Sequence, residues 1–461
     1  MAERIVGIAE EFVGVELGDW RRNARVIQMA ESMAREPKLS FPKAMSAAEL
    51  EATYRLLGNV KVEPTEVLRP HVEQTVLRMR AAETVLIAHD TSTISFRSED
   101  RDGLVERGDK QQFLVHCSLA IQGDESRRPL GVVALSRHLP VKSEGRRLQD
   151  RWGEQVQAVH GLGVGVSDVI HLMDREADDY ELLDLLKGMN ARFVLRMHHD
   201  RGLEGGSLRE SLERADFKAE RGVALTRRGK QAGSKQRQIH PPRNERVTSL
   251  SIATRQVTIS RTRQAKNARQ ETLTLNVVRV WEPEPPEGET PVEWVLYTSE
   301  PIDTAEQALQ VVDWYRARWV IEEYFKALKT GCAIEQRQLG DLHALSNALA
   351  LLAPIAWRLL VLRTEARDRP AAPASKALDR DEIHVLRLAV IERRRRRLPD
   401  NPTALDVMLS VASLGGHLKH NGPPGWQSLA HGYEVLRTLV AGWRLHRNAD
   451  AGFLEPFRDQ S

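Results

Sequence analysis

Two aspartates follow apolar runs that have the length and composition of β-strands. Asp90 comes two residues after the run 85–88, and Asp174 directly follows the run 169–173. In an open α/β sheet, ligand crevices form at the carboxyl ends of the strands, so both carboxylates could reach one site. An isolated Asp at a strand end is more often a turn former or a helix cap, so neither position alone establishes a site.

A predicted helix supplies a third carboxylate next to two cations. Thr304 and Gln307 have the spacing of a capping box, so we expect this helix to start there and to run to about residue 329. At about 100° per residue, four polar residues of the helix fall within an arc of about 60°. They are Tyr315, Arg318, Glu322 and Lys329. A solvated charged face is the alternative, but bulky apolar residues around the helix argue against full exposure.

Three converging carboxylates suit divalent metal ions. Hard cations such as Mg²⁺ prefer oxygen ligands, and two of them can activate the attacking oxygen and stabilise the leaving oxygen of a phosphoryl transfer. Arg318 and Lys329 beside Glu322 would hold the phosphate, Arg by its bidentate geometry and Lys as a point charge. The spacing therefore indicates metal-dependent phosphoryl transfer by Asp90, Asp174 and Glu322, with two Mg²⁺ ions per site and Mn²⁺ able to substitute.

The composition bounds the kind of protein. A chain of 461 residues is long enough for roughly three domains. The net charge of +3 does not by itself indicate a nucleic-acid partner, and two cysteines far apart exclude a disulfide framework and a Cys-based zinc site. The N-terminus lacks the form of a signal peptide, and polar residues within 344–362 favour a core helix over a membrane span. We expect a cytoplasmic protein that does not contact the membrane.

The elements that must position these residues change in kind along the chain. Residues 1–82 have helical periodicity, a Ser46-to-Glu49 capping box and Pro64 at the start of a helix. Short apolar runs then predict strands, with a helix at 178–187 between the last two. The predicted strands are 85–88, 113–121, 130–135, 169–173 and 193–195. This order predicts a mixed α/β region.

A β insertion and a second helical region follow. Residues 216–246 lose apolar periodicity and are rich in Lys and Arg, which predicts a mobile basic loop. Alternating segments at 256–260, 272–280 and 292–298 predict strands. A linker is expected at 370–375, and the chain beyond it is mostly helical. The five arginines at 393–397 could be a solvated helix end or a DNA contact, and the sequence does not decide between them.

Taken together, the motifs resemble those of the DDE transposases of the insertion-sequence-four family. The four residues of the helix face fit the family's Y-(2)-R-(3)-E-(6)-K signature without a gap. Asp174 opens the motif Asp-Arg-Glu-Ala-Asp, and Asp90 opens Asp-Thr-Ser, which match the second and first aspartate motifs of the family. Residues 17–25 resemble its end-recognition segment. The similarity runs from about residue 12 to Trp426, nearly the whole chain.

The resemblance implies a fold and a domain order. The fold is an α/β, RNase H-like mixed sheet core with a β-strand insertion, flanked by N-terminal and C-terminal helical domains. The implied domains are a helical DNA-end-binding domain at 1–82, a catalytic domain at 83–366 with its insertion at about 200–300, and a helical dimerisation domain at 376–461. The order of strands and helices read from the residues alone agrees with this.

Roles for single residues also follow from the resemblance. Trp294 corresponds to the aromatic that stacks on a base flipped from the transposon end, although a strand Trp is otherwise most often a core residue. Trp319 matches a second aromatic near that base. Tyr180 stands where a well-studied member of the family has a histidine, so a proton shuttle is not expected there. The implied DNA contacts are Tyr315, Arg318, Lys326, Lys329, Arg196, Arg21, Arg22 and Arg25.

By this resemblance the activity is cut-and-paste transposition, with nicking, hairpin formation, hairpin opening and strand transfer at one site. The expected partners are the terminal inverted repeats of double-stranded transposon-end DNA, target DNA and a second copy of the chain, in a prokaryotic cytoplasm at the nucleoid. Two alternatives remain. One is an RNase H-fold nuclease that only cuts, and the other is a non-catalytic DNA-binding remnant that inhibits transposition, against which the intact carboxylates argue.

Overall fold

The chain forms two compact units. The first comprises residues 1–83, 91–141 and 320–461, and the second comprises residues 84–90 and 142–319. Strand β1 (Val85–Arg97) contributes to both, because its residues up to Asp90 belong to the second unit and those from Thr91 belong to the first. The computed structural model describes residues 8–450 apart from 36, 38, 98–100, 141–146, 148, 166–167, 226–241, 395–396 and 419–422.

The N-terminal part of the first unit is helical, as the sequence predicts. Its elements are η1 (Ile8–Phe12), α1 (Trp20–Arg35), α2 (Phe41–Ala44), α3 (Ala47–Leu57) and α4 (Pro64–Arg80). The Ser46 hydroxyl accepts a hydrogen bond from the Glu49 amide, and the Glu49 carboxylate accepts one from the Ser46 amide, which confirms the capping box. Pro64 occupies the first turn of α4, where its missing N–H would be unsatisfied in any case.

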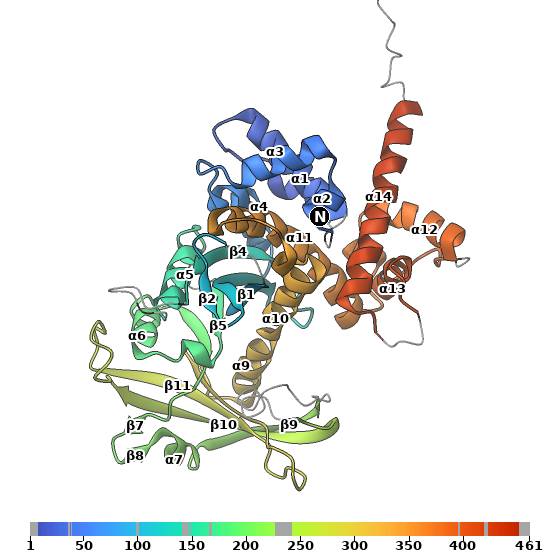
Figure 1. The fold of residues 1–461 in the computed structure, drawn as a ribbon. Helices are drawn as coiled ribbons and strands as arrows, with labels where there is room; N and C mark the ends of the chain where they lie inside the picture. Colours follow the sequence, from blue (N-terminus) through green and yellow to red (C-terminus); the bar gives the residue numbers. More distant parts are fainter. Residues whose placement is uncertain are drawn as a thin grey trace, which may run out of the picture. The chain divides into compact units, whose positions relative to one another are not determined.

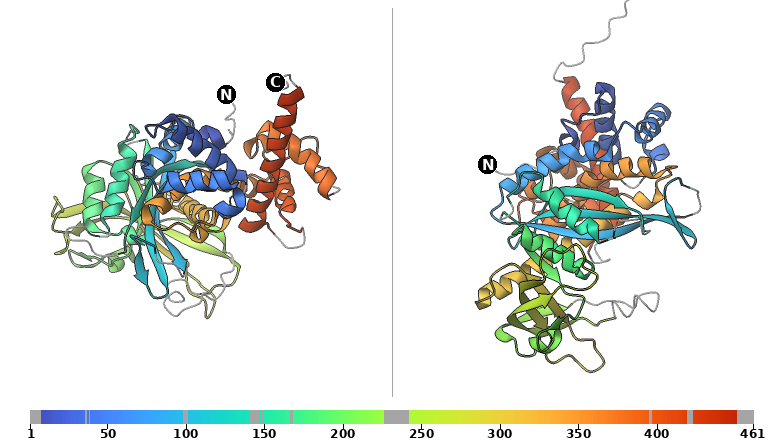
Figure 2. Two further views of the ribbon diagram at one scale, coloured as in Figure 1. Left: turned by 45° about the horizontal axis from the view of Figure 1, so that its top comes forward. Right: turned by 90° about the vertical axis from the view of Figure 1, so that its left-hand side faces the viewer.

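The C-terminal third of the chain is also helical. Its elements are α10 (Trp319–Lys326), η3 (Ala327–Gly331), η4 (Ile334–Gln336), α11 (Leu342–Asp368), η5 (Ala374–Lys376), α12 (Arg380–Arg394), α13 (Ala404–Leu414) and α14 (Trp426–Asp450). Helices α12, α13 and α14 pack on one another as a small bundle (Figure 2). α11 is long and apolar enough to cross a membrane, but its apolar stretch is wholly buried inside the protein. It is therefore the core helix that the sequence predicts.

Three strands complete the first unit, namely β2 (Val105–Arg107), β3 (Lys110–Gln122) and β4 (Pro129–His138). β3 pairs antiparallel with β2 and β4, and it lies beside β1 in the sheet. The rings of Phe96 on β1 and Phe113 on β3 stack with centroids 6.3 Å apart, and both are buried. The Trp357 indole of α11 donates a hydrogen bond to the Pro129 carbonyl over 3.0 Å, which fastens this helix to β4.

A buried charge cluster joins η1, α4 and β4. The Glu11 carboxylate is 1% exposed and lies 2.5 Å from His71 Nδ1 and 2.8 Å from Arg78 Nη1. His71 Nε2 accepts a hydrogen bond from the Val132 amide, so Nδ1 carries the proton and donates to Glu11. Burial alone would raise the pKa of Glu11, but the His71 and Arg78 contacts lower it to about 2.

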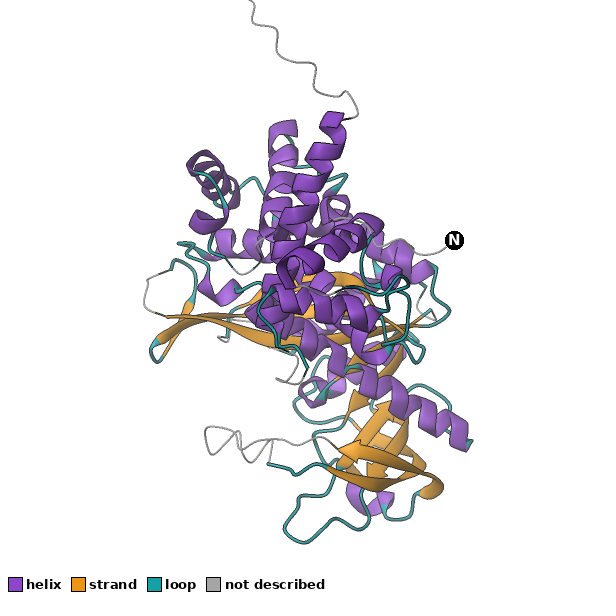
Figure 3. Ribbon diagram, turned by 90° about the vertical axis from the view of Figure 1, so that its right-hand side faces the viewer, coloured by secondary structure: helices purple, strands orange, loops and turns teal. Residues whose placement is uncertain are grey.

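The second unit contains a mixed sheet in the order β1–β5–β6–β12–β11–β10–β9. β5 pairs parallel with β1 and β6, whereas β6, β12, β11, β10 and β9 pair antiparallel in turn. The strands from β9 to β12 form a twisted sheet with a helix alongside (Figure 3). The strands are β5 (Val169–Met173), β6 (Arg192–Arg196), β9 (Asp216–Leu225), β10 (Arg246–Ser260), β11 (Thr272–Trp281) and β12 (Glu293–Thr298).

Helices cover this sheet and close its core. They are α5 (Asp150–His160), η2 (Arg175–Ala177), α6 (Tyr180–Gly188), α7 (Leu208–Leu212) and α9 (Ala305–Ala317), and a short hairpin joins β7 (Gly202–Leu203) to β8 (Gly206–Ser207). α5 and α6 lie side by side near β5 (Figure 1). Trp152 of α5 and Leu183 of α6 pack in one buried core with Phe193 of β6 and Tyr297 of β12.

The fold class predicted from the sequence is confirmed, because a mixed α/β core consistent with an RNase H-like sheet has helical regions at both chain ends. The predicted loop at 216–246 is wrong in part, since residues 216–225 form β9 and pair with β10. β9 is an edge strand without a fully buried residue, so no apolar alternation marks it. Residues 226–241 of that loop, and 395–396 of the arginine run, lie outside the described residues.

Replacement of Glu11 by Gln should lower the free energy of unfolding by about 3 kcal/mol, because it removes one partner of a buried ion pair. Since the pKa of Glu11 is lowered from 4.5 to about 2, its ionised form stabilises the fold above pH 4.5, and this stabilisation is lost as pH falls from 4.5 toward 2. Urea denaturation of the wild type and variant over this pH range measures both effects.

The matched control is Glu10→Gln, which removes the same charge from an exposed neighbour. It should be nearly neutral. Equal stability of the two variants, or a wild-type advantage that stays constant down to pH 2, would contradict the role given to Glu11.

Candidate active site

Asp90 and Asp174 lie level with each other on adjacent parallel strands. The β1–β5 register pairs Val85 with Val169 and Ala88 with Leu172. Two further residues along each chain lead to Asp90 and Asp174, and neighbouring strands are separated by about 4.8 Å. Both side chains are half-buried. The structure therefore brings together the two carboxylates that the sequence suggested for one site.

Asp90 does not end its strand, contrary to the sequence-based expectation. β1 continues to Arg97, so Asp90 lies in its interior, whereas β5 ends at Met173. The residues directly after Asp90 are polar and half-buried, and buried apolar residues return only at Ile94 and Phe96. The apolar run 85–88 therefore ends well before the strand does. The carboxylate pair thus lies at the level where β5 stops and β1 continues.

Arg318 brings a positive charge to the carboxylate pair. It follows α9, is 8% exposed, and places Nη1 3.7 Å from Asp90 Oδ2. A guanidinium stays protonated at any physiological pH. Arg318 therefore balances part of the negative charge of the aspartates, and its planar group could also bind a phosphate.

Tyr315 lies one helical turn before Arg318 and is 7% exposed. Burial raises the pKa of Tyr315, Asp174 adds to the increase, and Arg318 and Arg196 oppose it. The hydroxyl consequently remains a hydrogen-bond donor at neutral pH. The Trp294 ring meets the Tyr315 ring at an angle of 61° with centroids 5.9 Å apart. Four predicted site residues of the second unit are thus neighbours of Tyr315.

Arg196 and Trp294 come from the antiparallel pair β6 and β12. Arg196 Nη2 donates a hydrogen bond to the Glu293 carbonyl over 3.3 Å, and Arg196 also interacts with the Tyr315 hydroxyl. Trp294 is half-buried, so one part of its ring is accessible. Trp319 is 51% exposed on α10. Of the two tryptophans that the sequence grouped, Trp294 lies against Tyr315.

Glu322 and the two lysines belong to the first unit. Glu322 is half-buried on α10, four residues after Arg318 along the chain. Lys326 forms an ion pair with Glu323 over 2.6 Å. Lys329 lies in η3, a π-helical turn, and donates to the Thr93 carbonyl over 2.6 Å. The predicted helix is thus not one regular α-helix as far as Lys329, because α9 ends at Ala317 and a π-turn, which has more residues per turn, follows α10.

The two aspartates fit a divalent cation in their chemistry. They offer hard oxygen ligands on neighbouring strands, as Mg²⁺ and similar ions require. In the described part of the chain, no group of three or more His, Cys, Asp or Glu side chains gathers in an arrangement that could hold a metal ion. Asp90 and Asp174 are thus two carboxylates of the second unit whose oxygen atoms have the chemistry that a divalent cation requires.

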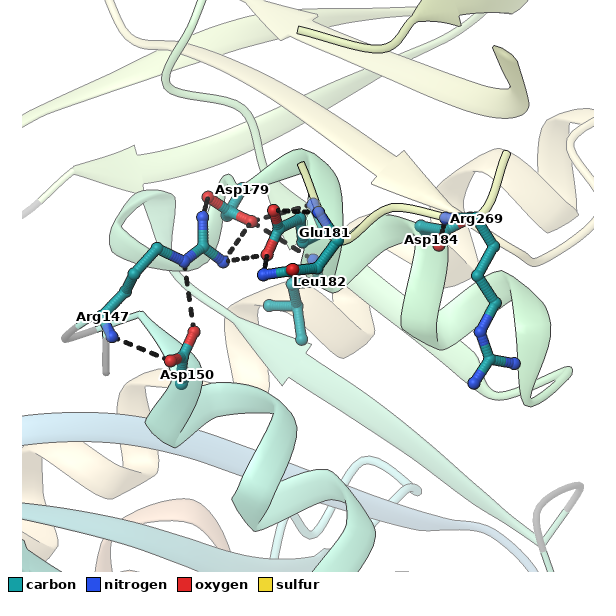
Figure 4. Close-up of polar contacts among 8 residues, drawn as sticks. Arg147, Asp150, Asp179, Glu181, Leu182, Asp184 and Arg269 are labelled. Atoms are coloured by element: carbon teal, nitrogen blue, oxygen red, sulfur yellow. Dashed lines mark hydrogen bonds and ion pairs between the residues drawn. The ribbon is translucent and has the colours of Figure 1, made fainter. Parts of the chain in front are cut away.

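The other acids after Asp174 make structural contacts. Glu176 pairs with Arg151 over 2.6 Å, and Asp178 pairs with Arg201 over 2.6 Å. Asp179 caps α6 through the Glu181 amide and also contacts Arg147, which lies between the starts of α5 and α6 (Figure 4). Each of these three acidic neighbours of Asp174 thus has a structural role in this segment of the chain.

Three histidines behind the aspartates were missed by the sequence analysis. His89 Nε2 lies 2.8 Å from His171 Nδ1, and His171 Nε2 lies 3.1 Å from His160 Nε2. His89 and His171 are fully buried, and burial, with His89 and His160 adding to it, lowers the pKa of His171 well below its usual value. The sequence shows only that His89 follows one apolar run and that His171 lies inside another, each shortly before an aspartate.

The arginines of the end-recognition segment lie at the start of α1. Arg21 is exposed, and its guanidinium lies 5.8 Å from the Trp20 ring. Arg22 donates a hydrogen bond to the Leu17 carbonyl over 3.0 Å, so part of its role is to hold the preceding turn. Arg25 is half-buried on the same helix. Trp20 is 73% exposed, which is unusual for a large aromatic residue.

Comparison with known proteins identifies two matching family models. Residues 8–62 match a model described as "Transposase DNA-binding", and residues 84–357 match one described as "Transposase DDE domain". Among solved structures, the chain is similar to a piggyBac transposase synaptic complex with hairpin DNA. The TM-score is 0.39 at 10% sequence identity, over 96% of this chain and 78% of that one. That similarity is too low to carry an argument about function.

Replacement of His171 by Leu should lower the free energy of unfolding by about 1 to 3 kcal/mol, because it removes the hydrogen-bond partner of the buried His89 and the half-buried His160. His171 stays neutral in the fold, whereas the unfolded chain takes up a proton below about pH 6.5. Wild-type stability should therefore fall as pH drops from 7.5 through 6.5. Chemical denaturation at several pH values should give a shallower fall for the variant.

The control is His199→Leu, at an exposed position beyond the end of β6. It should leave the midpoint and its pH dependence nearly unchanged. A His171 variant as stable as this control would show that the histidine chain does not support the strands of the two aspartates.

Proposed function

Because the chain belongs to the family of transposase DDE domains, we propose that it is a cut-and-paste DNA transposase with Asp90, Asp174 and Glu322 as its catalytic carboxylates. The observation that carries this proposal is the level placement of Asp90 and Asp174 on adjacent parallel strands, with Arg318 3.7 Å from Asp90. The match of residues 8–62 to a transposase DNA-binding model supports DNA as the substrate.

The finer assignment is to the insertion-sequence-four family. It rests on the unbroken spacing of Tyr315, Arg318, Glu322 and Lys329 along one helical run. We expect the reactions of that family, namely nicking, hairpin formation, hairpin opening and joining of the 3′ hydroxyl to target DNA. All are phosphoryl transfers, so one set of carboxylates suffices for them.

Transposase DDE domains use divalent metal ions, and we expect two Mg²⁺ per active site, with Mn²⁺ able to substitute. When bound, such ions activate the attacking oxygen and stabilise the leaving oxygen. Asp90, Asp174 and Glu322 would supply their oxygen ligands. Arg318 would balance charge at the scissile phosphate, and the protonated Tyr315 hydroxyl would donate a hydrogen bond to a phosphate oxygen.

Further DNA contacts are proposed on both sides of this site. Arg196, beside Tyr315, and Lys326 and Lys329, beyond Glu322, are the cations expected along the DNA backbone. Arg21 and Arg25 on α1 are expected to contact the transposon end, with Arg22 contributing less because it holds the Leu17 carbonyl. Trp294 is expected to receive the flipped base, since its half-buried ring rests against Tyr315 and one part of it is accessible.

The proposed partners are transposon-end duplex DNA with terminal inverted repeats, target DNA and a second copy of the chain. Leu388 and Ile391, two exposed apolar residues on α12, support a contact surface in the C-terminal helices. We expect the enzyme to act at the nucleoid in a prokaryotic cytoplasm. Inverted repeats bracketing the gene would favour transposition over the two alternatives, a nuclease and an inhibitory remnant.

We predict that Asp90→Asn, Asp174→Asn and Glu322→Gln each reduce cleavage of labelled end DNA in Mg²⁺ by about three orders of magnitude. Each change keeps the side-chain shape but removes a negatively charged metal ligand. Binding of the same DNA in a gel-shift assay should stay within a fewfold of wild type, because these residues hold metal and not DNA.

The matched control is Glu204→Gln, which removes the same charge from an exposed position of the second unit. It should cleave at close to the wild-type rate. Wild-type cleavage by any of the three test variants would remove that residue from the proposed catalytic set.

We predict that Trp294→Ala permits the first nick but slows hairpin formation by roughly ten- to a hundredfold. Only the hairpin step requires a base to leave the stack, and aromatic stacking repays ~1 to 3 kcal/mol of that cost. Trp294→Phe, which keeps an aromatic face, should restore most of the hairpin product. Denaturing gels that separate nicked DNA from hairpin DNA measure the two steps.

A thermal melt distinguishes this role from a purely structural one. If Trp294 only fills the core, the alanine variant will melt at a lower temperature and lose both products equally. That outcome would refute the stacking role while leaving the carboxylate assignments in place.

A further inference from the structure

β1 leads from Asp90 into a basic cleft of the first unit. The cleft has a volume of ≈ 740 Å³ and is lined by charged and neutral polar residues, without an apolar side chain. Its charged residues are Arg97, Arg101, Lys110, Lys329 and Glu335. Among the described lining residues, four cations against one carboxylate give a formal charge of +3. A polyanion is therefore the class of ligand that the cleft suits.

Glu335, the one carboxylate among the described lining residues, is held by contacts within the first unit. Glu335 Oε1 accepts a hydrogen bond from the Ser95 amide over 3.0 Å and lies 3.8 Å from Lys329 Nζ. Lys329 in turn donates to the Thr93 carbonyl. These contacts hold Glu335 and Lys329 in place, and the Glu335 carboxylate offsets the charge of Lys329. The remaining positive charge comes from the other three cations, which the transposase signature does not include.

Those three cations are set at the far end of β1 and at the start of β3. Arg97 is exposed at the last position of β1, and Lys110 is half-buried at the first position of β3. Arg101 is 7% exposed, its guanidinium lies 4.8 Å from the Phe96 ring, and its amide donates to Gln111 Oε1 over 2.8 Å. Arg101 is thus pre-ordered, so binding an anion would cost little side-chain entropy.

The position of the cleft along β1 suggests which anion binds there. Thr93 and Arg97 follow Asp90 by three and seven residues. From Thr93 to Arg97 the lining follows four residue steps of β1, roughly 13 Å at about 3.3 Å per residue, which exceeds the spacing between neighbouring phosphates along DNA. A volume of ≈ 740 Å³ is also far larger than one phosphate group requires.

We infer that Arg97, Arg101 and Lys110 form a phosphate-binding track of the first unit that holds the DNA backbone. This inference deepens the proposed function and rests on it for the identity of the polyanion. The DNA could be the transposon end or the target, which share the same phosphodiester chemistry. The track binds backbone without reading sequence, because cations on phosphates carry no base information.

The test is the salt dependence of DNA binding by the full-length chain without divalent metal. Removal of two phosphate contacts should reduce the slope of log affinity against log salt by about 1 to 2, and should lower affinity roughly tenfold at physiological salt. The variant is Arg97→Gln/Lys110→Gln. The control, Arg80→Gln/Lys187→Gln, removes the same charge from two exposed positions outside the cleft.

Two DNA duplexes distinguish the sources, one with the inverted repeat that brackets the gene and one of random sequence. A reduced slope on either duplex supports the track and identifies the DNA that it holds, and a reduced slope on both supports general backbone binding. Slopes equal to those of the control on both duplexes would overturn the inference. The single variants, each expected to change the slope by about 1, keep the test decisive if the double variant melts early.

This outcome is independent of cleavage. Loss of the salt effect would overturn the track even if the carboxylate variants behave as proposed. Wild-type cleavage by the carboxylate variants would instead overturn the catalytic assignment without altering the binding slopes.

Discussion

The parallel pairing of β1 with β5 is the constraint on which the candidate active site depends. A shift of one residue in this register would set Asp90 opposite Met173 or Arg175 and would turn alternate side chains to the other face of the sheet. The paired residues of both strands are buried, so such a shift would expose apolar surface. Burial of two short strand segments therefore fixes the spacing of two carboxylates.

That constraint also explains the polar groups behind the aspartates. His89 and His171 lie inside the paired strands, where a polar atom without a partner would cost about 1 to 3 kcal/mol. They satisfy each other and His160, which keeps the strands straight through the point where they present Asp90 and Asp174. Arg318 and Tyr315 are buried on the other side of the same constellation, so the charges and donors are ordered before any ligand arrives.

The sequence predicts well what depends on local pattern. The run 169–173 becomes β5 at the predicted bounds, and the capping boxes at Ser46 and Thr304 form as their spacing requires. It fails where a tertiary contact decides. β9 forms a strand by pairing with β10. β1 continues past Asp90 because β3 lies beside the residues that follow Asp90.

The same distinction between local pattern and tertiary contact applies to the candidate site. The sequence indicated chemistry from Asp90 and Asp174 after two apolar runs and from Arg318 on a polar helix face, and Arg318 lies 3.7 Å from Asp90. The sequence does not predict the chain of three histidines or the basic cleft, because each joins residues from elements that are far apart in the sequence. No periodicity links Arg97 to Lys329 or His89 to His160; contacts of η3 with β1 and of α5 with β5 bring the members of each group together.

The π-helical turn η3 gives one segment of the chain an unusual relation between length and direction. A π-turn contains one more residue than the α-helical turn it replaces, so the backbone after it is rotated relative to a regular helix. Deletion of a single residue there would let the turn close as an α-helix and would swing Lys329 by about 100° about the helix axis. The hydrogen bond from Lys329 to the Thr93 carbonyl thus depends on one additional residue in the turn, which the spacing of apolar residues does not reveal.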